Sequence, residues 1–305
     1  MMIAEFVDCC LWAYVVVDEL WRQLPPAYKP TRGPTAGCSA SELIAMALVG
    51  ECRGWTQETT LLRCWHGYRH LFPAIPERRR FNRRRRDLAQ AINALRQAIL
   101  AVLDVARDRQ CAIDNLPVPA LAFHLVPSAA GTDGWRAAGA GFGKVPTKKQ
   151  TIFGYKLHLL VTLGGVIRDF ALAPASASDV AVGAGLLGGH ADLTVLGDKA
   201  YISVPLAAAL QDARAVALLT VPRRNQRRQL PAAAARRRNA ARQIVETVND
   251  QLTAQFGIAA HHAHTFRGLC ARLYTKPTAH TLCIYLNRLL GVADWLQLKA
   301  LAFPY

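Results

Sequence analysis

Residues 193–201 constrain the fold of this chain more than any other stretch. Residues 193–196 have the character of a short buried strand, because three of the four are apolar and two are β-branched. Gly197 then allows the backbone to turn, and Asp198 follows directly. Sheets with helices on both faces bind ligands at the carboxyl ends of their strands, so Asp198 is well placed to face a site. An aspartate in this position is also a common turn former or helix cap.

Two further acids occupy comparable positions. Asp114 ends a short apolar run, and Pro117 and Pro119 just after it indicate that the chain leaves the sheet there. Glu246 lies on a helix, off its apolar stripe, and is the only glutamate after Glu77. Three carboxylates from two strand ends and one helix can chelate two divalent cations, an arrangement suited to phosphodiester chemistry.

The stretches around these acids resemble the DDE transposases of bacterial insertion sequences, which have the RNase H-like fold of retroviral integrases. The order and spacing of the acids fit that family, and the resemblance extends over nearly the whole chain. The stretches that carry it are residues 113–117, 153–162, 176–180, 197–201 and 244–247.

The resemblance implies that Asp114, Asp198 and Glu246 are the catalytic triad and hold two Mg²⁺ ions, for which Mn²⁺ can substitute. It implies a transposase that cuts the ends of its own element and joins the freed 3′ hydroxyls to target DNA. It further implies a homodimer acting on double-stranded DNA in the bacterial cytoplasm, at the nucleoid. Many relatives carry a basic residue about two turns after the glutamate. Here the next Lys or Arg is Arg267, so that DNA contact must come from elsewhere or be absent.

The expected architecture has two parts. Residues 1–105 are expected to form an all-α DNA-binding region, and residues 106–305 an α/β catalytic domain. In that domain, an RNase H-like mixed sheet is flanked by helices in the order βββαβαβα. Residues 128–149 read as a polar, glycine-rich loop. They do not fit a P-loop, because Ala138 and Val145 replace required residues.

Charge favours a polyanionic partner. The 305 residues carry a formal net charge of +16, mostly from arginine, which binds phosphate bidentately. A membrane surface would also attract such charge, but no apolar run is long enough to span a bilayer and the amino terminus lacks the pattern of a signal peptide.

The eight cysteines form no Cys-x-x-Cys motif and are expected to be reduced core residues. His261, His262 and His264 form the best remaining metal-like cluster, but no cysteine or acid lies at ligand spacing from them.

Seven of the nine residues from Arg78 to Arg86 are arginines. An apolar stripe begins at Phe81 and continues to Val102, so the run is expected to form the first turns of one long packed helix. Like charges at this density repel one another, and a phosphate backbone would offset them. The residues expected to contact DNA here and elsewhere are Arg79, Arg80, Arg83, Arg84, Arg86, Lys148, Lys149, Lys156, Lys199, Arg223, Arg224, Arg227 and Arg228.

Several alternatives remain open at this stage. His158 and Lys156 share one face of a predicted strand, and we expect that face to approach the substrate. His158 is then either a general base or a hydrogen-bonded sheet histidine. Asp250, one turn after Glu246, competes for the role of third carboxylate. The rival functions are a related nuclease without strand transfer and a non-catalytic DNA-binding protein descended from a transposase.

Overall fold

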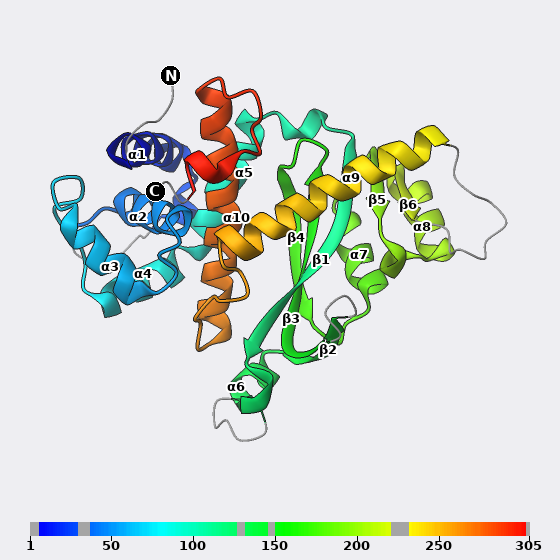
Figure 1. Cartoon of the computed structure of the whole chain (residues 1–305), viewed down its shortest axis with the longest axis horizontal. Coiled ribbons are helices and arrows are strands. Elements are labelled where there is room, and N and C mark those ends of the chain that lie inside the picture. Colours follow the sequence, from blue (N-terminus) through cyan, green and yellow to red (C-terminus); the bar gives the residue numbers. More distant parts are fainter. Residues whose placement is uncertain (1–5, 30–36, 127–131, 146–149, 221–231, 303–305) are drawn as a thin grey trace. The chain divides into compact units, whose positions relative to one another are not determined.

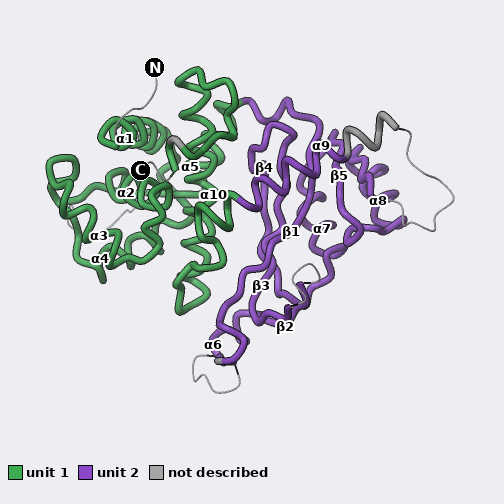
Figure 2. Tube along the Cα trace, viewed as in Figure 1, with its two compact units in different colours: residues 1–103, 251–305 green, residues 104–250 purple. Residues whose placement is uncertain are grey.

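The chain forms two compact units. A computed structural model of the protein describes residues 6–29, 37–126, 132–145, 150–220 and 232–302 (Figure 1). Unit 1 comprises residues 1–103 and 251–305, and unit 2 comprises residues 104–250 (Figure 2). The chain first passes from unit 1 to unit 2 between Leu103 and Asp104, near the expected boundary at residue 105. Residues 251–305, which we expected within the catalytic part, group instead with the amino-terminal helices.

Unit 1 is helical. Within the described residues, none of its helices or those of unit 2 combines the length and apolar character needed to cross a bilayer. The main helices of unit 1 are α1 (Phe6–Gln23), α2 (Ala40–Cys52), α3 (Glu58–Gly67), α4 (Arg78–Asp87), α5 (Ala89–Val102) and α10 (Phe266–Leu289). Short 3₁₀ segments lie at η1 (Pro26–Tyr28) and η7 (Leu298–Ala300), and a π-helical turn, η6, lies at Gln251–Gln255.

Helix α10 explains why the last segment groups with unit 1. It is buried on nearly all sides, with Leu269, Ala279 and Ile284 fully covered. It packs against α2, α4 and α5. A helix without a polar face must be surrounded by protein, so α10 completes the core of unit 1.

Two local predictions in unit 1 have different outcomes. The expected capping box at the start of α2 is confirmed, because Ser39 accepts from the Glu42 backbone N–H and Glu42 accepts from that of Ser39. The expectation of one long helix from residue 78 is wrong, because α4 ends at Asp87 and α5 begins at Ala89. The apolar stripe continues across this break, which is why periodicity alone did not reveal it.

Unit 2 is a mixed sheet flanked by helices. Its strands are β1 (Gln110–Leu121), β2 (Gly141–Val145), β3 (Gln150–Thr162), β4 (Ile167–Pro174), β5 (Leu193–Gly197) and β6 (Val216–Thr220). Its main helices are α6 (Thr132–Ala137), α7 (Asp179–Leu187), α8 (Val204–Arg214) and α9 (Ala232–Asp250), and its 3₁₀ turns are η2 (Val105–Arg107), η3 (Phe123–Leu125) and η5 (Lys199–Tyr201).

The strand order confirms the expected RNase H-like α/β class. The path is β2-β3-β1-β5-β6, and β4 pairs with β3 beside β2. Strand β1 is antiparallel to β3 and parallel to β5, and β5 is parallel to β6. An antiparallel β1-β3-β4 meander extended by two parallel strands therefore forms the sheet.

Two expectations about loops in unit 2 are wrong. Pro117 and Pro119 do not end β1, which stays paired with β3 past both of them. Strand β5 pairs β1 only up to Ile113, so the later part of β1 has a free side where proline is tolerated. The stretch expected as a glycine-rich loop contains α6 and β2, and Gly143 allows β2 to approach closely, since a Cβ there would lie 2.3 Å from the Ala175 carbonyl oxygen.

The two faces of the sheet carry different helices. Cys111 and Ile113 on β1 belong to a core cluster that also includes Leu186 and Leu187 of α7 and Leu210 of α8. Side chains alternate along a strand, so the intervening residues of β1 point to the opposite face. Helix α9 lies across that face (Figure 1) and packs against β1 and β5.

Candidate active site

The register of two parallel strands brings Asp114 and Asp198 to the same place. Ile113 on β1 pairs with Gly197 on β5, and each is followed directly by one of the two aspartates. Neighbouring strands lie about 4.8 Å apart, so the two carboxylates start from adjacent backbone positions. A Cβ at Gly197 would meet Ile113 Cγ2 and Tyr201 Cβ at 3.3 Å, so this glycine permits close packing at the strand end.

The third acid, Glu246, lies on helix α9, which packs across β1 and β5. Val245 and Val248 are buried, whereas Glu246 is exposed between them. Asn249, on the face of the helix that carries Glu246, donates a hydrogen bond from Nδ2 to Asp114 Oδ2 at 2.8 Å. This bond fixes which face of the sheet the Asp114 carboxylate uses, and it is the face covered by α9.

Each carboxylate has a protein partner. Asp198 caps η5, with its Oδ1 accepting from the Ala200 backbone N–H at 2.7 Å. Asp198 therefore acts as a helix cap and also follows directly after the end of β5. Glu246 Oε1 lies 2.7 Å from Arg242 Nε in a pair whose side chains are 50% and 70% exposed. Exposed pairs of this kind contribute at most about 1 kcal/mol, so Glu246 can exchange this partner readily.

The three acids and Arg242 interact electrostatically. Burial raises the pKa of Asp114 to about 6, the bond from the Asn115 backbone N–H lowers it, and the charges of Asp198 and Glu246 raise it further. Arg242 lowers it. Like charges held near one another in a partly desolvated place favour a bound cation.

The donor set fits a hard divalent cation. Its ligands are carboxylate oxygens, which Mg²⁺ prefers, and Asn249 Oδ1 is a buried acceptor without a hydrogen-bond partner. Within the described chain, no three His, Cys, Asp or Glu side chains converge closely enough to hold a metal ion as they lie here. The bonds that Asn249 and Arg242 make to Asp114 and Glu246 account for these orientations, and both bonds are single and exchangeable.

A buried polar chain lies on the other side of the same strand ends. The Tyr201 hydroxyl is fully buried and lies 2.8 Å from His158 Nδ1, and Asn115 hydrogen-bonds to the same hydroxyl. Asn115 follows Asp114, and Tyr201 ends the turn that Asp198 begins. The chain thus links the backbones that carry two of the three acids. The sequence analysis did not find this link, although Asn115 and Tyr201 lie inside the stretches that carry the family resemblance.

His158 and Lys156 do not face the strand end that carries the acids. His158 is fully buried, and burial lowers its pKa to about 4, with Asp179 opposing that shift. Lys156 Nζ donates to Asp179 Oδ1 at 2.8 Å, and both side chains are 16% exposed. The expectation that their face of the strand approaches the substrate is wrong, because α7 covers it. His158 is a hydrogen-bonded sheet histidine.

Apart from Lys156, the residues predicted to contact DNA fall into three groups. Lys199 is exposed beside Asp198 in unit 2. Arg79, Arg80 and Arg83 are exposed on α4 of unit 1, and Arg86 and Arg84 are half-buried there, with Arg84 donating to the Cys38 carbonyl. The third group lies outside the described residues and comprises Lys148, Lys149, Arg223, Arg224, Arg227 and Arg228.

One arginine of the same run has a structural role. Arg85 is 1% exposed and bonds to Glu51, which also accepts from Lys276 Nζ at 2.6 Å. Burial alone would raise the pKa of Glu51, but Lys276 and Arg85 hold it at about 2. Arg85 occupies the helical position between Phe81 and Leu88, so the apolar stripe already marked it as inward-facing.

The eight cysteines are all free, and six of them are buried, as expected for reduced core residues. Cys52 and Cys283 come nearest to each other, with 3.4 Å between their sulfurs.

Comparison with known families supports the assignment of the fold. The family model of the transposase DDE domain matches residues 129–282, half of the chain. The matched region contains Asp198 and Glu246, whereas Asp114 precedes it. No curated protein and no solved structure matches the chain significantly. Together with the RNase H-like sheet, the match shows that the chain belongs to the transposase DDE domain family.

Proposed function

We propose that the protein binds the ends of its insertion sequence as a homodimer, cleaves the DNA strands there and joins the 3′ hydroxyl ends to target DNA. Family membership supports a transposase-type function. The observation that carries the chemistry is the register of β1 on β5, which sets Asp114 and Asp198 beside each other under the helix of Glu246.

In this proposal Asp114, Asp198 and Glu246 hold Mg²⁺, which when bound activates the attacking oxygen and stabilises the leaving oxygen. Glu246 reaches the strand ends from α9 by releasing Arg242, whose guanidinium is then available to a DNA phosphate. Asn249 keeps its donor on Asp114 and so fixes the direction of that carboxylate. Lys199, exposed beside Asp198, holds a phosphate next to the scissile bond.

Two rivals make different predictions. A nuclease of the same fold would cleave without joining, and a non-catalytic binder would do neither. The three carboxylates argue against a simple binder, because anions facing a phosphate backbone weaken binding unless a cation compensates them.

The test uses duplexes that carry the inverted repeats flanking the gene. Purified protein is expected to cleave them with Mg²⁺ or Mn²⁺ and to join the product to a second duplex. Asp198→Asn should keep the fold and the DNA affinity but lose cleavage. Undiminished cleavage by a contamination-free variant would remove Asp198 from the mechanism, and cleavage without joining would favour the nuclease.

A further inference from the structure

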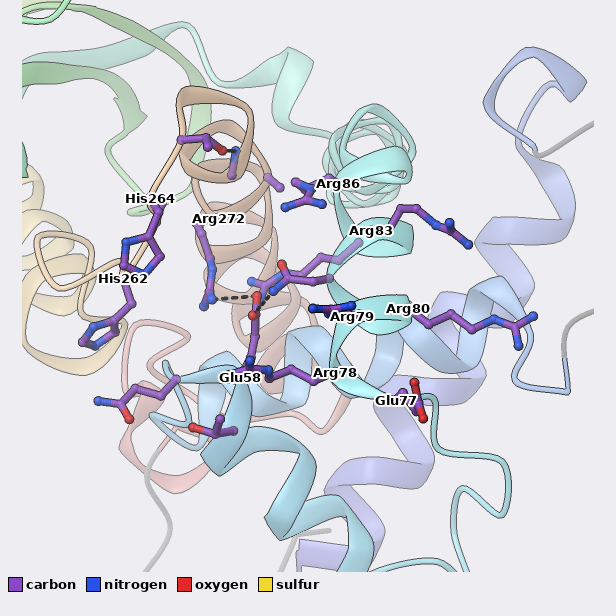
Figure 3. Close-up of a pocket in the computed structure, with 18 residues that line it drawn as sticks. Glu58, Glu77, Arg78, Arg79, Arg80, Arg83, Arg86, His262, His264 and Arg272 are labelled. Atoms are coloured by element: carbon purple, nitrogen blue, oxygen red, sulfur yellow. Dashed lines mark hydrogen bonds and ion pairs between the residues drawn. The ribbon is translucent and has the colours of Figure 1, made fainter. Parts of the chain in front are cut away.

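Unit 1 contains a large basic pocket. Its volume is about 950 Å³, and it lies between α4, the start of α3 and the segment from His262 to Arg272 that leads into α10. Figure 3 shows His262 and His264 on one side of the opening and α4 with its arginines on the other. The pocket therefore has three walls, formed by the start of α3, by α4 and by residues 262–272.

The arginines of the pocket follow one face of α4. Arg79, Arg83 and Arg86 recur at helical spacing, and the opposite face of the helix is anchored by buried Phe81 and Arg85. The three therefore cannot turn into the core. None of them has a carboxylate within 4.0 Å among the described residues, so their charges are not neutralised by the protein.

The acid deeper in this pocket is already compensated. Glu58 accepts from Arg272 Nη2 at 2.8 Å and from Asn82, and its side chain is 13% exposed. Arg272 is held in turn by the Thr56 carbonyl oxygen at 2.5 Å. Glu77 lies at the outer end of α4 and forms no ion pair in the described part of the chain. The pocket consequently keeps a strong positive charge.

Two further features of the opposite wall suit an anion. Burial lowers the pKa of His262, and the charges of Arg272, Lys276 and His264 lower it further, as expected in a positive environment. Thr265 caps α10, a helix of 24 residues whose amino-terminal end favours negative charge.

The spacing of the arginines distinguishes a polymer from a small anion. Seven residues of helix separate Arg79 from Arg86, which is about 10 Å along the axis. One DNA strand carries a phosphate about every 3.4 Å along the duplex axis, and successive phosphates also wind around that axis, so this row can face more than one phosphate. A free phosphate or a nucleotide would occupy only part of it.

We propose that the pocket formed by Arg79, Arg83 and Arg86 of α4 together with His262, His264 and the start of α10 binds the phosphate backbone of double-stranded DNA. This inference rests on the proposed function and adds a second wall from the carboxyl-terminal segment to the arginine run. The site holds the DNA substrate through a sequence-independent contact made by unit 1.

The first experiment measures binding of a fluorescent element-end duplex at several salt concentrations, in the full chain carrying Asp198→Asn. Replacing Arg79, Arg83 and Arg86 together by Gln should lower affinity by roughly tenfold or more and reduce the log–log salt slope by about two to three, since each neutralised phosphate contributes close to 0.9. The matched control replaces Arg22, Arg63 and Arg69 by Gln, which removes the same charge from exposed positions of unit 1 outside the pocket. Equal losses in both variants would overturn the proposal.

The second experiment tests the wall from the carboxyl-terminal segment. A photo-crosslinking amino acid at position 264 should label bound duplex DNA, and the same group at position 63 should not. Labelling at neither position would overturn the composite site. If an RNA duplex of the same sequence is labelled more strongly than the DNA duplex, the pocket is an RNA site. If millimolar inorganic phosphate abolishes the labelling, the pocket is a site for free phosphate.

The outcomes also separate this inference from the proposed function. Pocket variants with an intact triad should recover cleavage at saturating DNA, because their loss is in KM and not in kcat. A protein that binds DNA through the pocket but never cleaves would leave the pocket standing and remove the transposase chemistry.

Discussion

Asn249 Nδ2 lies 2.8 Å from Asp114 Oδ2, and this hydrogen bond joins the helix that carries Glu246 to β1 at Asp114, directly after the last residue of β1 that pairs with β5. The two residues are far apart in the chain, yet one bond sets the direction of a carboxylate of the proposed triad. Partners of this kind are worth about 10- to 100-fold in activity or metal affinity in known metal sites.

Asn249→Leu is therefore expected to lower kcat for cleavage by roughly 10- to 100-fold while DNA affinity stays the same. The Mg²⁺ concentration needed for half-maximal rate should rise in parallel. Steady-state kinetics across a Mg²⁺ titration measure both quantities. An unchanged kcat would mean that Asp114 keeps its orientation without this bond.

Glu246 and Asp250 can be separated on the same helix. Glu246 is coupled electrostatically to Asp114, whereas Asp250 is exposed. Glu246→Gln is expected to abolish cleavage and joining, and Asp250→Asn to keep most of both. The reverse pattern in a quantitative cleavage assay would move the third ligand to Asp250.

The raised pKa of Asp114 predicts a pH-dependent stability effect. A carboxyl whose pKa is raised by folding destabilises the native state where it is ionised. This loss in the free energy of unfolding is absent below about pH 4, grows as the pH rises and is complete above about pH 6. Asp114→Asn should therefore be more stable than the wild type by on the order of 1–3 kcal/mol at pH 7 without divalent cations. Denaturant titrations at pH 4 and pH 7 measure this, and an equal difference at both values would contradict it.

The Tyr201 hydroxyl is expected to matter for the reaction as well as for the fold. Tyr201→Phe leaves His158 and Asn115 without a partner, which costs about 1–3 kcal/mol in a buried place. It should also lower kcat, because the linked backbones carry Asp114 and Asp198.

Tyr155→Phe is the matched control for this variant. Tyr155 is buried in the same sheet, and its hydroxyl bonds to the Ala138 carbonyl oxygen at 3.1 Å. It should lose comparable stability in urea titrations but keep kcat. Equal loss of kcat in both variants would show a general effect of sheet stability.

Arg85 and Arg83 should respond in opposite ways. Arg85→Met leaves Glu51 Oε1 buried without its donor while Lys276 still compensates the charge, and a buried acceptor that loses its hydrogen bond costs about 1–3 kcal/mol. Arg83→Met, at an exposed position, should change stability by no more than about 0.5 kcal/mol while weakening DNA binding. Urea unfolding followed by tryptophan fluorescence separates them. A stable Arg85→Met variant would show that the buried charges can rearrange.

The local sequence predicted the end of β5 well for a physical reason. A buried strand followed by Gly197 and Asp198 has few alternative conformations, and the capping box at Ser39 is satisfied by residues three apart. The hydrogen bond from Asn249 was also accessible in principle, because Asn249 follows Glu246 by three residues on one helix face.

Other features depend on contacts that no local pattern contains. Pro117 is tolerated in β1 only because β5 stops pairing earlier, and the fate of the Lys156 side chain depends on where α7 places Asp179. The apolar stripe marks Arg85 as inward-facing, but its partners Glu51 and Lys276 come from two other helices and no local pattern identifies them.

The discontinuity of unit 1 has a consequence for synthesis. Because domains tend to fold as they emerge from the ribosome, residues 104–250 can complete their sheet and bring Glu246 over it before α10 has been translated. Helices α1 to α5 must wait for α10 with their apolar faces unfilled. A chain that stops before Phe266 would therefore carry all three acids in a finished unit 2, together with a helical unit that cannot close.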